Sequence, residues 1–364
     1  MRKILVFSVL FIIIYLLLAF SGKFSHDESI SYTVIITFLL LSIGIILLGC
    51  ELFANGVECV GDKMDLSHAT SGSILAAVGT ALPETLLPVL ALIFGQKAHS
   101  QSIAVGAILG APFMLSTLAF FLVGTVSFVL WLLKKRERPV MQTNLVSFKT
   151  ELLFFITTMS GLLIVSLINN KTLNHVSAFL LLLVYFLFVK VSLSHASEEG
   201  EEYTEHFHFS FIMDCPPNMK WITIQTFIGL MLIVIGAHIF VNYITLLSLK
   251  SGMSSLVLSL LLAPVATELP EKFNSITWAI KKKDTLAMSN ISGAMVFQST
   301  IPVSIGLLFT EWNLGNTEML NILFSLSMAT ITYVIVKIKG TLPSWALMCG
   351  GIFYLAYIIR IFSR

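Results

Sequence analysis

The sequence predicts an all-α integral membrane protein built from two inverted five-helix repeats, with one further helix at the N-terminus. Three observations support this fold class. Of the 364 residues, 56% are hydrophobic and only 12% are charged, whereas a soluble domain carries about 25% charged residues. Apolar segments of roughly 20 residues, the length of a transmembrane helix, recur along the chain. The second half of the chain also repeats residues of the first half in register.

The first expected element comprises residues 1–22. Met1-Arg2-Lys3 precedes an apolar run from Ile4 to Phe20, which is typical of a secretory signal peptide or of a retained signal-anchor helix. The run is long for a signal peptide, and this favours a retained helix. Either interpretation places the N-terminus inside the membrane-enclosed compartment.

Ten further helices are expected, five in each repeat. Their approximate ranges are 33–61, 67–95, 101–133, 150–169, 174–193, 222–248, 254–280, 285–309, 317–336 and 342–362. The first repeat therefore covers residues 33–193 and the second covers 221–364. Between them, residues 194–220 are rich in Glu and His, and we expect a solvated, cytoplasmic acidic linker, with weak divalent-cation binding as the alternative.

The basic residues support one orientation of these helices. Cytoplasmic loops carry an excess of Lys and Arg. The loops rich in these residues are 134–138, 281–284 and 337–340, and they follow the third, seventh and ninth expected helices. All three lie on the inner side if the first helix of the ten enters the membrane from outside. The corresponding helices of the two repeats then cross the membrane in opposite directions.

A short motif occurs once in each repeat. Leu82-Pro83-Glu84 follows Thr80, and Leu269-Pro270-Glu271 follows Thr267, at a constant offset of 187 residues. The same offset relates Gly236 to Gly49. A carboxylate within a transmembrane helix is costly and usually functional, and a proline there leaves a backbone carbonyl without its helical donor. Each motif thus offers the oxygen ligands that a hard cation prefers.

Inverted repeats with interrupted helices near the membrane midplane are the architecture of secondary transporters. The alternative, in which the prolines only kink structural helices, does not explain why Thr-x-x-Pro-Glu is repeated. An enzyme is not expected, because no nucleophile–base or metalloprotease arrangement is evident. A nucleic-acid partner is not expected either, because no basic patch is interleaved with aromatic residues.

Other polar and aromatic positions allow less specific expectations. Glu51 and Asn55 lie on one helical stripe, and they could line an ion path or be hydrogen-bonded within the helix packing. His238 occupies the position that corresponds to Glu51 in the second repeat, with the same alternatives. The Phe120-Phe121 and Phe154-Phe155 pairs are expected to face lipid.

The repeated motifs resemble those of the sodium/calcium exchanger superfamily of cation/calcium antiporters. Members of that family carry two inverted repeats with a motif close to Gly-Thr-Ser-Leu-Pro-Glu, followed on the next helix by one close to Gly-Ser-Asn-x-Phe-Asn. The resemblance covers all ten helices. It implies exchange of calcium, or another divalent cation, against sodium or protons, without a cofactor, in the plasma membrane, which would be the inner membrane of a bacterium.

The resemblance also implies which residues bind the cation. Glu84 and Glu271 would be the central acidic ligands, with Thr80 and Thr267 supplying hydroxyl or backbone oxygens. The backbone carbonyls of the family correspond to Ala77 and Pro264. Gln298 lies where exchangers carry an Asp or Asn side chain.

Several positions depart from the family pattern, and these departures identify the chain as a divergent member. Leu115 lies where an amide is expected, and Ala111 and Ala294 replace serines. Glu268 adds a carboxylate three residues before Glu271, on the same side of the helix. The sequence therefore predicts altered selectivity or proton coupling, with the cation bound mainly by the second repeat.

Two alternatives remain open at this stage. The chain could exchange monovalent cations against protons, or it could be a non-transporting relic of the exchanger fold. Its partners would be the lipid bilayer and inorganic cations, and the sequence does not indicate an oligomeric state.

Overall fold

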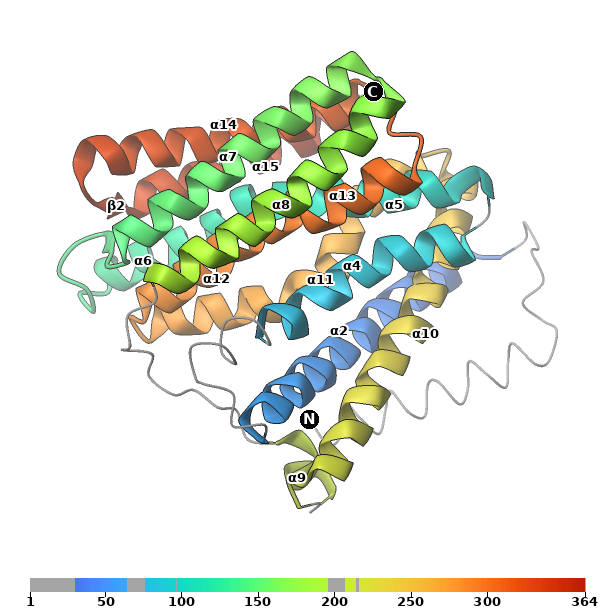
Figure 1. Cartoon of the computed structure of the whole chain (residues 1–364), viewed down its shortest axis with the longest axis horizontal. Coiled ribbons are helices and arrows are strands. Elements are labelled where there is room, and N and C mark those ends of the chain that lie inside the picture. Colours follow the sequence, from blue (N-terminus) through green and yellow to red (C-terminus); the bar gives the residue numbers. More distant parts are fainter. Residues whose placement is uncertain (1–29, 64–75, 96, 196–206, 214–215, 364) are drawn as a thin grey trace. The chain divides into compact units, whose positions relative to one another are not determined.

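The computed structural model describes residues 30–63, 76–95, 97–195, 207–213 and 216–363. Within these ranges the chain is almost entirely helical (Figure 1). Its elements are α2 (Tyr32–Lys63), α4 (Ala76–Phe94), α5 (Lys97–Met114), the π-helix η2 (Leu115–Ala119), α6 (Phe120–Leu132), β1 (Val140–Met141), α7 (Leu145–Ile168), α8 (Lys171–His195), α9 (His208–Met213), α10 (Met219–Ser251), α11 (Ser255–Ile280), α12 (Asp284–Gln298), α13 (Ile301–Phe309), α14 (Asn316–Lys339), β2 (Leu342–Pro343) and α15 (Ser344–Phe362).

The all-α membrane architecture predicted from the sequence is confirmed. Eight helical segments are long and apolar enough to cross a membrane, and the described chain contains two shorter apolar segments, Glu84–Phe94 and Ser255–Leu269. Together they correspond to the ten expected helices. The two shorter segments belong to α4 and α11, which carry the repeated motif. The expected N-terminal helix, 1–22, lies outside the described residues.

The chain folds into two compact units, and each unit takes helices from both expected repeats. The first unit comprises residues 1–100 and 197–258, and its helices are α2, α4, α9 and α10. The second unit comprises residues 101–196 and 259–364, which include α6–α8 and α12–α15. Helices that are adjacent in the sequence, such as α10 and α11, are thus divided between units.

In the first unit, α2 and α10 pack together through glycines. A Cβ atom on Gly49 would lie 2.8 Å from the backbone nitrogen of Ile233 and 2.9 Å from the carbonyl oxygen of Gly229. Gly49 and Gly236, which the repeat relates to each other, both lie in this contact, because a Cβ on Gly236 would meet Ile46. Small residues allow transmembrane helices to approach this closely. Helix α4 packs against both members of the pair.

Part of the polar segment 194–220 is not a solvated linker, and the prediction is wrong for residues 207–209. Phe207, His208 and Phe209 are buried, and α9 packs on α10. The side chain of Asn55 on α2 accepts hydrogen bonds from the backbone N–H of His208 (3.1 Å) and from Nε2 of Gln225 (2.9 Å). This end of the segment is therefore held by the burial of its apolar side chains and by the hydrogen bonds to Asn55. The Glu-rich part, 196–206, lies outside the described residues.

The polar stripe on α2 therefore serves packing at Asn55, which is one of the two expected alternatives. Glu51, one turn earlier, lies 3.1 Å from Nε2 of His208. His238 on α10 is exposed, and its ring contacts the side chain of Asn242 and the edge of Phe94.

The second unit contains two irregular helices. Pro112 lies inside α5, and the chain continues through the π-helix η2 into α6. Helices α12 and α13 are separated by Ser299 and Thr300, and Pro302 occupies the first turn of α13. Because proline has no N–H, the carbonyl of Gln298 lacks its helical donor at this break. An interrupted helix is typical of transporter folds.

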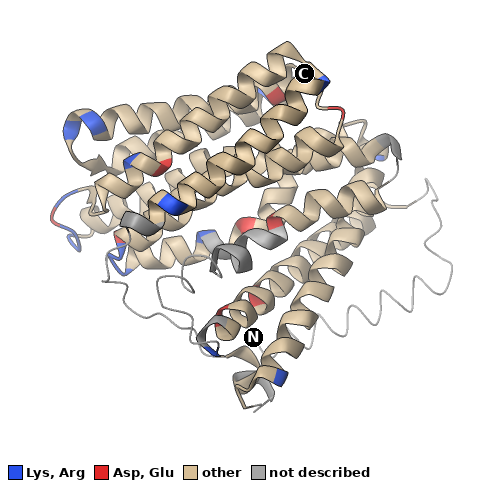
Figure 2. Cartoon of the chain, viewed as in Figure 1, with Lys and Arg blue, Asp and Glu red and all other residues tan. Residues whose placement is uncertain are grey.

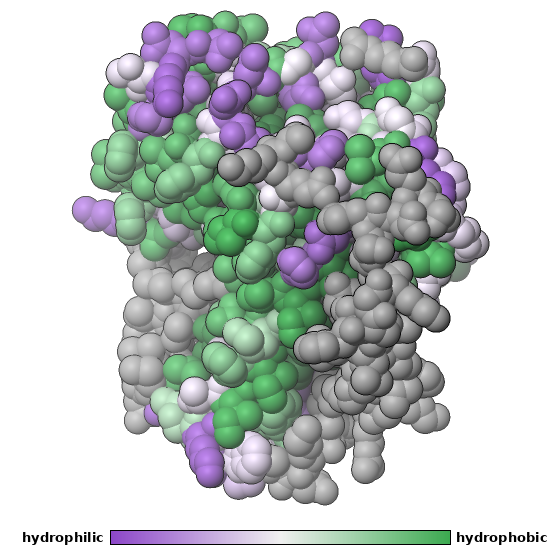
Figure 3. Space-filling view, turned by 90° about the vertical axis from the view of Figure 1, so that its right-hand side faces the viewer, coloured by the Kyte–Doolittle hydropathy of each residue, from purple (hydrophilic) through white to green (hydrophobic). Residues whose placement is uncertain are grey.

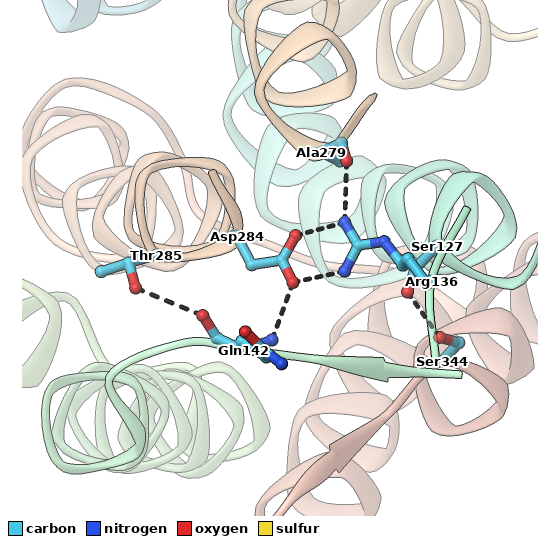
Figure 4. A network of polar contacts seen from close by, with 7 residues as sticks. All are labelled: Ser127, Arg136, Gln142, Ala279, Asp284, Thr285 and Ser344. Atoms are coloured by element: carbon cyan, nitrogen blue, oxygen red, sulfur yellow. Dashed lines mark hydrogen bonds and ion pairs between the residues drawn. The ribbon is translucent and has the colours of Figure 1, made fainter. Parts of the chain in front are cut away.

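Two of the loops that the basic residues placed inside, 134–138 and 281–284, contact each other in the second unit (Figure 4). Arg136 donates two hydrogen bonds of 2.5 Å to the carboxylate of Asp284 and a third to the carbonyl of Ala279, at the end of α11. The backbone N–H of Gln142 also donates to Asp284. Strand β1 pairs with β2, which follows the third loop. These contacts bring the loops together at one end of the unit, and their position on the inner side of the membrane stays a prediction.

Charge and hydropathy are distributed as expected for a membrane protein. Figure 2 shows that charged residues gather in loops and at helix ends, with few along the helices. Hydrophobic residues cover much of the described surface on the face shown in Figure 3. The expectation that both phenylalanine pairs face lipid is wrong for Phe120 and Phe155, which are fully buried. Adjacent helical positions point about 100° apart, so one member of each pair faces the core.

The glycine contact in the first unit yields a stability prediction. We expect Gly49→Leu to destabilise the protein by about 1–3 kcal/mol, because the larger side chain would separate α2 from α10. Gly44→Leu is the matched control, since a Cβ at Gly44 on the same helix meets nothing within 4 Å. Thermal unfolding of both variants in detergent measures the difference. Equal melting temperatures would contradict the role of the glycine contact.

Candidate functional site

The motif of the first repeat lies on α4, in the first unit. This helix runs without a break through Pro83 and ends at Phe94. Glu84 is buried, with 5% of its surface exposed. Because Pro83 has no N–H, the carbonyl of Gly79 has no donor in the helical ladder. Ala77 and Thr80 lie on the same helix, but their side chains are outside the described part of the chain.

The motif of the second repeat lies on α11, which is also continuous from Ser255 to Ile280. In a continuous helix the carbonyls that lack a donor are those four residues before a proline, at Leu260 and Ala266. The resemblance assigned a ligand carbonyl to Pro264 itself, but that carbonyl faces the N–H of Glu268 in a regular helix. Pro264 therefore acts on the backbone by freeing Leu260.

Thr267 is the motif threonine of α11. It is buried, with 6% of its surface exposed, and its hydroxyl donates to the carbonyl of Ala263 at 3.3 Å. This bond leaves the lone pairs of the hydroxyl oxygen available to a cation. Glu271 belongs to the same helix, and its side chain lies outside the described residues.

Gly110 brings α5 against the freed carbonyl of α11. A Cβ on Gly110 would lie 2.2 Å from the carbonyl oxygen of Leu260 and 2.8 Å from Cγ of Pro264. Only a glycine allows this approach. Ser259 reinforces the contact, since its hydroxyl donates to the carbonyl of Ile103 at 2.7 Å. The second motif of the first repeat thus packs on α11 just before the first motif of the second repeat.

Glu268 has a cationic partner that the sequence analysis missed. Nζ of Lys272 donates to the carboxylate of Glu268, and the two side chains are 3% and 0% exposed. The pair follows the i, i+4 spacing of helical ion pairs, which was a readable signal in the sequence. Lys272 neutralises the charge that Glu268 adds, so the electrostatic reason for placing the cation mainly in the second repeat no longer holds.

Gln298 ends α12 beside the helix break. The side chain is buried, with 1% exposure, and its Nε2 has no hydrogen-bond partner among the residues that the structure describes. Nδ2 of Asn290 donates to the hydroxyl of Ser275 and links α12 to α11 at 2.9 Å. Along α11, Thr267 lies as many residues from Ser275 as Gln298 lies from Asn290 along α12. Thr267 and Gln298 are therefore equally distant from the Asn290–Ser275 link.

The positions that depart from the family motif offer no side-chain oxygen. Leu115 and Ala111 are buried in the second unit, with exposures of 1% and 4%. The neighbouring hydroxyls of Ser116 and Thr117 donate to carbonyls of their own helix, at Pro112 and Phe113.

Within the second unit, the structure brings Gly110 against Leu260 and Pro264, on the same helix as Thr267. Glu84 belongs to the first unit, which is described by itself. No group of three or more His, Cys, Asp and Glu side chains with metal-binding geometry occurs among the described residues. Taken separately, the first unit offers a buried carboxylate and a freed carbonyl, and the second unit offers freed carbonyls and a buried amide.

The buried ion pair of α11 yields a second prediction. We expect Lys272→Met to lower the stability by about 3–5 kcal/mol, because Glu268 loses its countercharge. The double variant with Glu268→Gln should recover most of this loss, since the carboxylate is then absent as well. Thermal unfolding in detergent of the two single variants and the double variant gives the coupling. Additive effects would contradict the pairing.

The comparisons with known proteins cover most of the chain. The model of the sodium/calcium exchanger protein family matches residues 34–193 and 221–363. An uncharacterised membrane protein of Methanocaldococcus jannaschii is 23% identical over 324 residues, which are 88% of this chain and 95% of that protein. The putative antiporter CaxA of Alkalimonas amylolytica is 22% identical over 280 residues, covering 74% of this chain and 79% of its own.

Solved structures of exchangers have the same fold. The crystal structure of the H⁺/Ca²⁺ exchanger CAX aligns with a TM-score of 0.74 and 14% identity, over 99% of this chain and 87% of that one. The sodium–calcium exchanger NCX_Mj aligns with a TM-score of 0.55 and 19% identity, over 90% of this chain and 98% of that one. The chain therefore belongs to the sodium/calcium exchanger family of multi-pass membrane proteins.

Proposed function

We propose that the protein is a secondary active antiporter that exchanges calcium, or another divalent cation, against protons or sodium. The observation that carries this proposal is the Thr-x-x-Pro-Glu motif, which occurs on two apolar helices of opposite expected direction. One of its glutamates, Glu84, is buried within its unit. A carboxylate retained in both copies, at membrane depth, indicates cation binding rather than helix packing.

The chemistry of α4 and α11 suits a hard divalent cation. Such ions bind carboxylate, carbonyl and hydroxyl oxygens. Glu84 and Glu271 supply the charge in the proposal, Thr80 and Thr267 supply hydroxyls, and the prolines free carbonyls of each helix. Two carboxylates balance the charge of one divalent ion, so desolvating that ion within the membrane costs less free energy.

Exchange follows from competition for the same two glutamates. A divalent cation and the counter-ions cannot neutralise the same carboxylates together, so release of one permits binding of the other. In the proposed cycle the two repeats, which have opposite topology, expose the glutamates alternately to the two sides of the membrane. An ion from either side can then bind only after the previous ion has left.

The residues of this chain favour protons as the counter-ion. Sodium sites need several neutral oxygen ligands, and Leu115, Ala111 and Ala294 lack side-chain oxygens. Protons need only the carboxylates themselves. Among the solved relatives, CAX is described as an H⁺/Ca²⁺ exchanger and NCX_Mj as a sodium–calcium exchanger, so both counter-ions occur on this fold.

The first test replaces the glutamates. We expect Glu84→Gln and Glu271→Gln each to abolish calcium uptake into proteoliposomes, because the amide keeps the shape but loses the charge. Glu311→Gln is the matched control, because it removes an exposed carboxylate of the second unit. Size-exclusion chromatography confirms that each variant is folded. Wild-type uptake by either motif variant would overturn the assignment.

The second test identifies the counter-ion. Calcium uptake is measured under an imposed proton gradient and, separately, under an imposed sodium gradient. We expect uptake to follow the proton gradient and to stop when a protonophore is added. Sodium-driven uptake that resists the protonophore would assign sodium instead. Competition by monovalent cations alone would favour a monovalent cation/proton antiporter, and absence of uptake for every ion would indicate a non-transporting relic.

A further inference from the structure

A buried carboxylate lies outside both repeated motifs. Glu151 is the seventh residue of α7, in the second unit, and 8% of its surface is exposed. The helix, Leu145–Ile168, is long and apolar enough to cross a membrane. Glu151 therefore lies about 9 Å along the helix from its inner end. The mechanism proposed above does not use this residue, and ionisable residues at such positions are usually functional.

The partner of Glu151 is a hydroxyl group. Oγ of Ser292 on α12 donates a hydrogen bond to Oε2 of Glu151, and the same Oγ lies 2.7 Å from the carbonyl oxygen of Met288. A hydroxyl has one hydrogen, so it can donate to only one of these oxygens at a time. When the carboxyl of Glu151 is protonated it donates to Ser292, and the serine donates to Met288. When the carboxyl has lost its proton, the serine turns to Glu151.

The charged and titratable groups nearby leave Glu151 without a countercharge. Helix α7 packs against α8, α12 and α14. Lys149 precedes Glu151 by two positions and points to another side of α7, and Asp284 on α12 is bound by Arg136. The titratable groups with described side chains on the inner halves of α8 and α14 are Tyr185, Lys190, Tyr333, Lys337 and Lys339. Among the described residues, no ion pair includes Glu151.

An unpaired negative charge on Glu151 would cost free energy, because the carboxylate is buried. The effective cost of burying an unpaired ion is several kcal/mol, whereas a neutral carboxyl with one hydroxyl partner satisfies both groups. The neutral form thus fits the surroundings as the structure shows them. A proton is the one cation that needs no further oxygen ligands there.

A second polar contact continues from this pair along the same two helices. The hydroxyls of Thr158 and Ser299 lie 2.8 Å apart. Thr158 lies seven residues, about two turns, after Glu151 on α7, and Ser299 lies seven residues after Ser292 along α12. Ser299 directly follows Gln298. Polar side chains therefore connect α7 and α12 from Glu151 to the helix break.

We propose that Glu151 and Ser292 form a proton-binding site within the second unit, separate from the motif glutamates, and that the proton held there adds a regulatory step to the pH dependence of cation exchange. Binding of the proton to Glu151 changes the hydrogen bonding of Ser292 on α12, the helix that ends at Gln298. The reaction is a simple equilibrium in which the carboxyl of Glu151 releases its proton to water on the inner side and takes one up from it. The second part of the inference rests on the proposed antiport.

Infrared spectroscopy of the purified protein tests the proton site without any transport. A protonated carboxyl has a C=O stretching band that shifts in deuterated water. We expect part of this band to disappear in Glu151→Gln and to persist in Glu311→Gln, the matched surface control. Ser292→Ala keeps the carboxyl and removes its partner, so the band should move to the frequency of a carboxyl without a hydrogen bond. A band unchanged by both variants would overturn the site.

The pH profile of calcium uptake tests the second part. Glu151→Gln keeps a neutral group that can donate to Ser292, so we expect uptake to persist and its profile against internal pH to lose the step due to Glu151, while the dependence due to the exchanged protons remains. A wild-type profile in this variant would contradict the regulatory role. If the wild-type protein transports no cation at all, the proposed function fails, while the infrared experiment still decides whether Glu151 binds a proton.

Discussion

A buried charge costs free energy unless it is paired, and one such pair joins the loops of the second unit. Asp284, at the first turn of α12, is bound by both terminal nitrogens of Arg136 and by the backbone of Gln142. These bonds join the loop before α7 to the turn between α11 and α12. Removing one partner of such a buried pair usually costs about 3–5 kcal/mol. The positions of α7, α11 and α12 at their inner ends therefore depend on this one carboxylate.

The other buried acids of the second unit are balanced differently. Glu268 has a lysine one turn away, and Glu151 has only a serine. The first arrangement fixes a charge pair whose net charge is zero, so it adds little to the field that a cation meets. The second arrangement leaves the protonation state of Glu151 dependent on its surroundings. Two residues that look alike in the sequence thus differ in what they can exchange.

Much of the fold could be read from the sequence, since hydrophobic length and the repeated motif are local signals. The ten apolar segments agree with the structure. The pair of Glu268 and Lys272 was also readable, because its spacing is that of one helical turn. The contact of Glu151 with Ser292 was not, because the two residues are 141 positions apart in sequence and nothing in either segment marks its partner. The burial of Phe120, Phe155 and Phe209 likewise depends on which helices become neighbours.

The glycine contact between α2 and α10 has a consequence for how the protein is made. Helix α2 leaves the ribosome long before α10, with the whole first repeat and the acidic segment synthesised between them. During that interval the backbone around Gly49 must face lipid or other helices of the nascent chain. The first unit can therefore be completed only after the second repeat has begun to enter the membrane. Biogenesis of this protein thus requires that α2 stay inserted without its partner α10 until the second repeat is made.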